Sequence, residues 1–290
     1  MKRWWLLVIV TVLGLACNVP IPTSQPLTVI EPVQVSQTVD LEGAERADIS
    51  LKLLNGDLTL QPGDLSLLQA DFHYNVQEWE PKIESSTKDD TRKVSISQGV
   101  GSELTLGEDD TYINEWTITL ARGVPMKLHI TLGSGRASLA LGGLSLTEAS
   151  ITTGKSETTI SFDEANPEPL SALRLTAGMG DVVISGLGNA NLDRLSLIGG
   201  TGSVDLDFSG AWRRSALAEV TAGTGSVTIR VPADLGVRIT FTGTPVTSVS
   251  TVGFTETEEN TYTNEAYGTA SLTLTIKLSA GLGKIMLISQ

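Results

Sequence analysis

The chain has 290 residues, with 20 Lys and Arg against 33 Asp and Glu, and a formal net charge of −13. This acidic balance argues against nucleic acid and anionic membrane surfaces as partners, because both carry negative charge. Two His and one Cys exclude most metal sites and the common Ser/His and Cys/His catalytic arrangements. The sequence therefore predicts no catalytic residues, no bound metal and no cofactor.

The first 17 residues have the order of an export signal. Lys2 and Arg3 precede an apolar run from Trp4 to Ala16, and the single cysteine, Cys17, follows. The run is shorter than the roughly 20 residues of a membrane-spanning helix, so a cleaved signal peptide over residues 1–16 is favoured over a transmembrane anchor. Exported proteins usually pair their cysteines or lack them, which favours a special role for Cys17 over an incidental one.

This segment resembles a bacterial lipoprotein signal. The resemblance implies cleavage before Cys17, lipidation of that residue, and an extracytoplasmic protein anchored to a membrane of the cell envelope. Residues 17–44 then form the lipidated cysteine and a spacer, because Pro20, Pro22, Pro26 and Pro32 stand among small and polar residues that favour an extended chain.

Residues 45–123 predict less regular β-structure. Apolar and polar residues alternate from Ala70 to Val76, at Val94 and Ile96, and from Trp116 to Leu120, as expected of strands with one buried face. Residues 89–92 and 108–110 read as polar turns.

Residues 124–242 contain a repeat of about 22 residues. Each copy has two alternating halves joined by a glycine corner, usually G-x-G, where a bend or a positive φ is needed. The copies cover residues 128–140, 149–161, 173–185, 195–207 and 218–230, with a weak relative at 51–63 and a closing copy at 276–288. Such a unit cannot bury its own apolar face, so consecutive copies must stack as parallel neighbours.

The repeat alignment predicts specific neighbours. Arg136 aligns with Glu157, and Asp207 aligns with Arg230, so both pairs should be adjacent on the outer surface. Residues 243–269, rich in Thr and Glu, are expected to form a long insertion or loop before the closing copy. The predicted fold is all-β: stacked parallel β-repeats, solenoid-like or sandwich-like, with glycine corners.

An ordered set of segments resembles the bacterial toast-rack family. The set comprises ADFHYNV (70–76), KIESS (82–86), NEWTITL (114–120), VPMKLHITLGSGRASLALGGL (124–144), VPADLGVRI (231–239) and SAGLGKIML (279–287). The resemblance covers about residues 45–290. It implies a stacked β-domain of unknown function, related to adhesin-like repeats and to the extracytoplasmic part of cell-wall-antibiotic response regulators, and it implies no catalytic residues.

Several motifs invite a chemical interpretation beside a structural one. Repeated G-x-G suggests nucleotide binding, but strand alternation rather than a helix follows each copy. The acidic clusters at residues 108–110 and 256–259 could bind calcium loosely, although solvated charge is the simpler interpretation. His73 and His129 fall on polar strand faces, where an exposed histidine is the default.

Two further features bear on carbohydrate chemistry. Asp205 and Asp207 lie two apart on one strand face, as paired carboxylates of a glycosidase could. Of the tryptophans downstream of the signal, Trp79 and Trp212 are predicted to be the more exposed.

Three functions follow as hypotheses. The first is a non-enzymatic, envelope-tethered domain that presents a binding surface to a protein or glycan. The second is a polysaccharide-active enzyme of β-helix type. The third is an envelope-stress or cell-wall-response component that acts through a membrane partner.

Overall fold

The computed structural model describes residues 27–99, 112–244 and 247–290. The predicted signal, Cys17, residues 18–26 of the predicted spacer and the predicted turn at 108–110 lie outside these ranges. The prediction that the spacer extends to residue 44 is wrong, because residues 29–39 form strand β1 (Val29–Val39), which pairs with the folded domain. Within them, neither of the two short 3₁₀-helices is long and apolar enough to cross a membrane.

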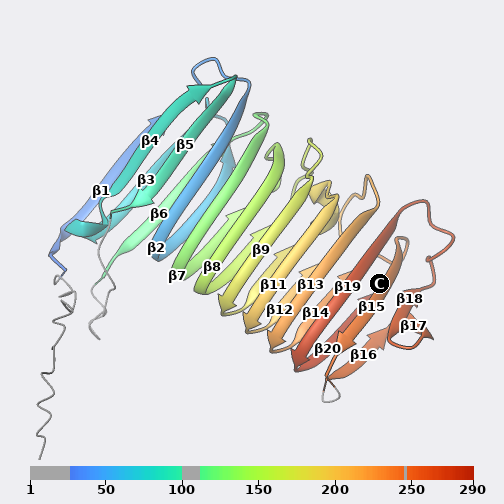
Figure 1. The fold of residues 1–290 in the computed structure, drawn as a ribbon. Helices are drawn as coiled ribbons and strands as arrows, with labels where there is room; N and C mark the ends of the chain where they lie inside the picture. Colours follow the sequence, from blue (N-terminus) through green and yellow to red (C-terminus); the bar gives the residue numbers. More distant parts are fainter. Residues whose placement is uncertain (1–26, 100–111, 245–246) are drawn as a thin grey trace, which may run out of the picture.

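The repeats form a stack of parallel strands, as predicted (Figure 1). The first three units are single strands bent at the corner, whereas the later units are divided there into two strands. The units in chain order are β2 (Arg46–Gly63), β7 (Met126–Ala140), β8 (Leu146–Ser161), β9 and β10 (Ala172–Met179, Val182–Ser185), β11 and β12 (Arg194–Thr201, Val204–Asp207), β13 and β14 (Ala216–Thr224, Val227–Val231), and β19 and β20 (Thr273–Leu282, Lys284–Ser289).

The corners fold the sheet into two layers. In each repeat unit, the segment before the corner pairs only with the segments before the corners of neighbouring units, as in β9–β11–β13. The segments after the corners pair with one another in the same way, as in β10–β12–β14. We call these the first layer and the second layer. Figure 1 draws the first layer in front.

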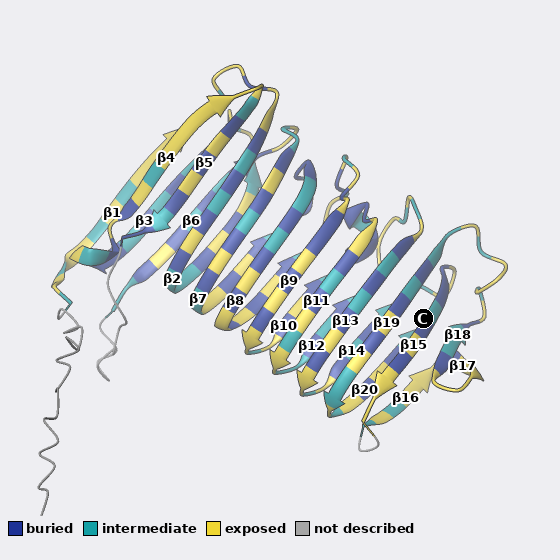
Figure 2. Cartoon of the chain, in the orientation of Figure 1, coloured by how far each residue is buried: buried dark blue, intermediate teal, exposed yellow. Residues whose placement is uncertain are grey.

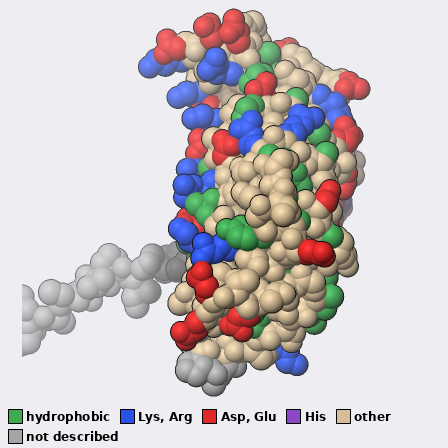
Figure 3. Space-filling model, turned by 90° about the vertical axis from the view of Figure 1, so that its right-hand side faces the viewer, with side chains coloured by type: hydrophobic (Ala, Val, Ile, Leu, Met, Phe, Trp, Pro, Cys, Tyr) green, Lys and Arg blue, Asp and Glu red, His purple; other side chains and the backbone are tan. Residues whose placement is uncertain are grey.

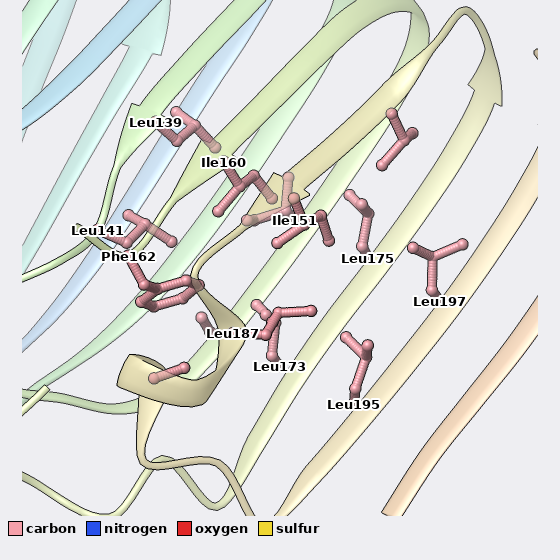
Figure 4. Packing of buried hydrophobic residues seen from close by; sticks show 14 of the residues in the cluster. Leu139, Leu141, Ile151, Ile160, Phe162, Leu173, Leu175, Leu187, Leu195 and Leu197 are labelled. Atoms are coloured by element: carbon pink, nitrogen blue, oxygen red, sulfur yellow. The ribbon is translucent and has the colours of Figure 1, made fainter. Parts of the chain in front are cut away.

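The core lies between the two layers. Buried and exposed residues alternate along every repeat strand (Figure 2), and the buried set forms one continuous cluster. In Figure 4, Leu173, Leu175, Leu195 and Leu197 of the first layer lie on the same core as Leu139 and Ile160 of the second. Leu, Ile, Val and Ala thus build the core, as the composition requires.

The order of units in the stack differs from their order in the chain. Strands β5 (Thr91–Gln98) and β6 (Asn114–Ala121) lie outside β2, although they follow it in sequence. At the other end, β15 (Gly236–Gly243) and β16 (Ser248–Val252) lie outside β19 and β20, which follow them. The closing copy in the sequence is therefore an internal unit of the stack.

Antiparallel strands end the stack. At the N-terminal end, β4 (Pro81–Lys88) pairs with β5, while β3 (Leu68–Val76) joins β6 to β1 (Val29–Val39). At the C-terminal end, β18 (Thr261–Asn264) joins β15 to β17 (Phe254–Glu258). Of the two alternatives predicted for residues 243–269, the loop is wrong and the insertion fits, because β16, β17 and β18 form there ahead of the closing copy. Phe254 and Thr261 are buried against the end of the core, while the Glu side chains point to solvent.

Connecting segments close the side of the sandwich opposite the corners. They contain η2 (Leu187–Ala190) and several buried asparagines. The side chain of fully buried Asn166 accepts a hydrogen bond from Leu146 N (3.0 Å) and donates to Leu146 O (2.9 Å) and Ala190 O (3.2 Å). These backbone groups cannot reach water. The asparagine side chain therefore supplies the hydrogen bonds that strand pairing would otherwise make between successive turns.

The prediction that Trp79 is exposed is wrong. Helix η1 (Gln77–Trp79) turns the chain so that the indole ring is only 2% exposed, and it packs beside Tyr112 with ring centroids 5.8 Å apart. The prediction rested on the glutamates on either side of Trp79. In a single helical turn, however, neighbouring side chains point in different directions, so exposed glutamates do not imply an exposed tryptophan. Trp212 is half-buried: its ring stacks on Phe208, and its indole N–H donates to Phe208 O at 2.9 Å.

Candidate binding surface

The glycine corners are structural elements. At Gly202, φ is +141°, and a Cβ atom would lie 2.6 Å from the carbonyl carbon of Gly180 on the adjacent unit. The corner amides are hydrogen-bonded to the adjacent unit: Gly180 N donates to Thr201 O and Gly202 N donates to Thr224 O, both at 2.9 Å. An N–H engaged in the ladder cannot also bind phosphate, so these corners do not form a nucleotide loop.

The predicted neighbours are adjacent in the stack. Arg136 and Glu157 are register partners, and Arg136 Nε lies 3.6 Å from Glu157 Oε2 on the exposed surface. Asp207 and Arg230 are also register partners. The Arg230 guanidinium, however, forms its ion pair with Asp205, one position diagonally away.

Both carboxylates of the suggested glycosidase pair are engaged by neighbours. Asp205 accepts a hydrogen bond from Arg230. Asp207 accepts hydrogen bonds from Ser209 N (2.9 Å) and Ser209 Oγ (2.7 Å), which end the strand in a local turn. Asp205 therefore links adjacent turns of the stack, whereas Asp207 caps the end of its own strand.

The histidines and the described acidic cluster also have structural partners. His73 Nδ1 lies 3.0 Å from Glu115 Oε2, and His129 Nε2 lies 3.6 Å from Asp48 Oδ1, both partly exposed. In the acidic cluster, Glu256 caps the β17–β18 turn, whereas Glu258 pairs with Arg238. Across the described ranges, no group of three or more His, Cys, Asp or Glu side chains is placed to hold a metal ion.

Ion pairs cross the outer side of the first layer. Glu148 lies between Lys127 and Arg174, and farther along the stack Glu219 lies between Arg194 and Lys277. A hydrogen bond from Arg174 lowers the pKa of Glu148, and one from Lys277 lowers the pKa of Glu219. Figure 3 turns this layer to the left, where Lys and Arg side chains gather.

A row of hydroxyl side chains runs beside these ion pairs. The residues occupy one register position on successive first-layer strands, and each is exposed. The row consists of Thr131, Thr152, Thr176, Thr221, Ser279 and Thr242, interrupted between Thr176 and Thr221 by exposed Ile198. Sequence analysis missed this row, although a Thr or Ser stands two residues before the first corner glycine in five copies of the repeat. Adjacent members are separated by about the 4.8 Å of neighbouring strands.

Comparison with known proteins agrees with this architecture. The family model described as the N-terminal domain of toast_rack, DUF2154, matches residues 30–185 and 165–230. No curated protein gives a match.

Among solved structures, a candidate cell adhesion protein from Clostridium sporogenes is 24% identical, with a TM-score of 0.47, over 90% of this chain and 100% of that one. A candidate adhesin from Bacteroides fragilis is 12% identical, with a TM-score of 0.40, over 89% and 97% of the respective chains. A candidate lipid binding protein from Parabacteroides distasonis is 10% identical, with a TM-score of 0.33, over 88% and 96%.

Proposed function

Because the chain belongs to the family of the toast-rack N-terminal domain, we propose that it is a non-enzymatic binding domain, tethered to the cell envelope through Cys17, that presents its outer β-surface to a protein or glycan. The hydroxyl row carries this proposal. Seven adjacent strands present one register position outward, and six of the seven side chains there are Thr or Ser. Hydroxyl groups both donate and accept hydrogen bonds, so a regular row of them suits an extended ligand with repeating polar groups.

The rigidity of this surface supports a binding role. Buried Leu side chains alternate with the exposed hydroxyl residues on the same strands, as Leu175 does with Thr176. The core therefore fixes each hydroxyl position before a ligand arrives, which reduces the entropy lost on binding.

The tether rests on the N-terminal sequence. Residues 1–16 have the order of an export signal, Cys17 follows, and the first described strand begins at Val29. Eleven residues separate Cys17 from Val29. An extended chain of that length would reach roughly 30 Å, enough to hold the domain clear of lipid headgroups.

Intact mass and membrane partition of the full chain, beside a Cys17→Ala variant, test the tether. A Cys17-dependent mass increase equal to acyl chains, lost with membrane association in the variant, is the expected result. An unlipidated wild-type protein in the soluble exported fraction would contradict it.

Binding is tested separately by screening the protein against envelope glycans and envelope proteins. Thr152→Ala/Thr176→Ala should weaken binding of a true ligand, whereas Thr59→Ala/Thr159→Ala, on exposed positions of the second layer, serves as the matched control. Equal binding by both double variants would remove the hydroxyl row from the site.

A further inference from the structure

One part of the outer surface has a charge opposite to that of the whole chain. Strands β4, β5 and β2 are adjacent at the N-terminal end of the first layer. They carry five exposed cations that form no ion pair with any described residue. These are Arg46, Lys52, Lys82, Lys88 and Lys93, which we call the basic face.

Strand register arranges these cations in rows across the layer. Lys88 and Arg46 are both opposite Thr91, so they flank it from the two neighbouring strands. Lys82 and Lys52 flank Ser97 in the same way. Each pair is separated by two strand spacings, or roughly 10 Å. Lys93 lies between these rows. Its register partner on β2 is Asp48, and the partner of Asp48 on β7 is Lys127.

The basic face is hollowed into a continuous groove. One part, of about 420 Å³, is lined by Ser50, Ser86, Ser95 and Lys93, among others. A second part, of about 630 Å³, is lined by the cations Arg46, Lys88, Lys93 and Lys127 and by the carboxylates Asp48, Asp89 and Glu168, among others. The two parts are contiguous, because Asp48 and Lys93 line both. The groove therefore combines cations with hydroxyl groups over several strands.

We propose that this groove binds an anionic glycan, an extended carbohydrate polymer that carries carboxylate or phosphate groups. Charge complementarity favours this ligand, since Lys and Arg without carboxylate partners are available to negatively charged oxygens. The serine hydroxyls supply hydrogen bonds to the neutral hydroxyls of the sugar. The proposal rests on the binding role proposed above and names the class of ligand.

The position of the acidic residues favours a polymer over an anionic bilayer. Four carboxylates, of Asp48, Glu84, Asp89 and Glu168, line the groove beside the cations. A flat bilayer would press headgroup phosphates against all of these carboxylates, whereas a single polymer chain can follow the cations and avoid the carboxylates.

The net charge of −13 does not oppose this assignment. At physiological ionic strength, charges beyond about 8 Å are largely screened, so a ligand in the groove responds mainly to the side chains around it.

Binding of the purified full chain to polygalacturonate, to phosphomannan and to neutral dextran tests the proposal. We expect the wild type to bind at least one of the two anionic polymers, to bind dextran at least tenfold more weakly, and to lose affinity as salt is raised. The preferred polymer identifies carboxylate or phosphate as the recognised group.

The variant Lys88→Glu/Lys93→Glu should bind the preferred polymer about tenfold more weakly than wild type, because two charges that line the groove are reversed. Lys155→Glu/Lys284→Glu is the matched control: both lysines are exposed, form no ion pair among the described residues, and lie outside the basic face. The control should remain within twofold of wild type. All four residues are exposed, and circular dichroism checks that both variants fold.

Three results would overturn the proposal: equal loss of affinity in both variants, equal binding of dextran and the anionic polymers, or binding to anionic lipid vesicles without binding to either anionic polymer. These outcomes are distinct from failure of the proposed function. A chain that binds a neutral glycan or a protein through the hydroxyl row, and no anionic polymer, keeps the binding role and loses the basic groove.

Discussion

Replacement of a corner glycine should destabilise the whole stack. We choose Gly202→Ala, because Gly202 lies in the middle of the repeat array, with φ at +141°. The new Cβ would lie 2.6 Å from the carbonyl carbon of Gly180 and 3.3 Å from Asp181 N. Both are backbone atoms of the adjacent unit, so neither can move away without shifting a paired strand.

Two effects determine the size of the change. A non-glycine residue in this conformation costs about 1–3 kcal/mol of backbone strain. Forcing an extra methyl group into a packed backbone contact costs a further 1–3 kcal/mol. Their sum gives a loss of roughly 4 kcal/mol in the free energy of unfolding, a large share of the 5–15 kcal/mol typical of a folded domain.

Gly268→Ala separates the two effects. Gly268 also has a positive φ, +91°, but nothing lies within 4 Å of the position that its Cβ would occupy. This control should therefore lose only the strain component, about 1–2 kcal/mol.

Urea unfolding, followed by circular dichroism and tryptophan fluorescence, measures the difference. Buried Trp79 and Trp116 report on the N-terminal end of the stack, and half-buried Trp212, beside Phe208, reports on its middle. If Gly202→Ala is no less stable than Gly268→Ala, close approach of neighbouring corners does not explain the glycines.

Three further predictions concern the core, the connecting side and the ion pairs. Leu175→Ala should lower the unfolding free energy by about 3 kcal/mol in urea titration, because it removes a fully buried side chain; a loss below about 1 kcal/mol would show that the layers are loosely packed. Asn166→Ala should cost about 3 kcal/mol, because one N–H and two carbonyl groups lose their partner. The control Gln61→Ala, whose exposed amide donates to Thr119, should stay within about 0.5 kcal/mol, and a similar loss in both variants would refute the role of burial. Finally, Arg174, Arg122 and Lys277 lower the pKa of Glu148, Glu164 and Glu219 below the unfolded value. Their contribution is therefore present above the unfolded pKa and is lost as pH falls through the folded pKa, so the urea midpoint should decrease between about pH 5 and pH 3. A midpoint that is constant over that range, or that rises toward low pH, would contradict this assignment.

The proposed basic groove refines the argument from net charge. The net charge of −13 disfavours an anionic partner only if all charges of the chain act on that partner together. Ion pairs such as Arg136 with Glu157 remove much of the charge elsewhere, whereas Lys52, Lys82 and Lys93 remain unpaired on adjacent strands. A total summed over the chain cannot reveal this separation, because strand pairing determines which charges are neighbours.

The sequence by itself determined the repeating unit and its packing. Alternation in stretches such as residues 173–185 identifies the buried face of each strand, and the glycines mark the corners. Alignment of the copies at their glycine corners also determines the register, which is why the adjacency of Arg136 and Glu157 could be predicted. These features are local or repeat along the chain, so one sequence suffices to read them.

Only the tertiary structure decided how the stack ends. Strands β5 and β6 lie outside β2, and β15 and β16 lie outside β19 and β20, against their order in the chain. The burial of Trp79 and the assembly of the basic face on β4, β5 and β2 follow from this arrangement. Alternation records which side of a strand faces the core, but not which strand lies beside it. That choice depends on contacts between residues far apart in sequence, which decide how the two ends of the core are covered.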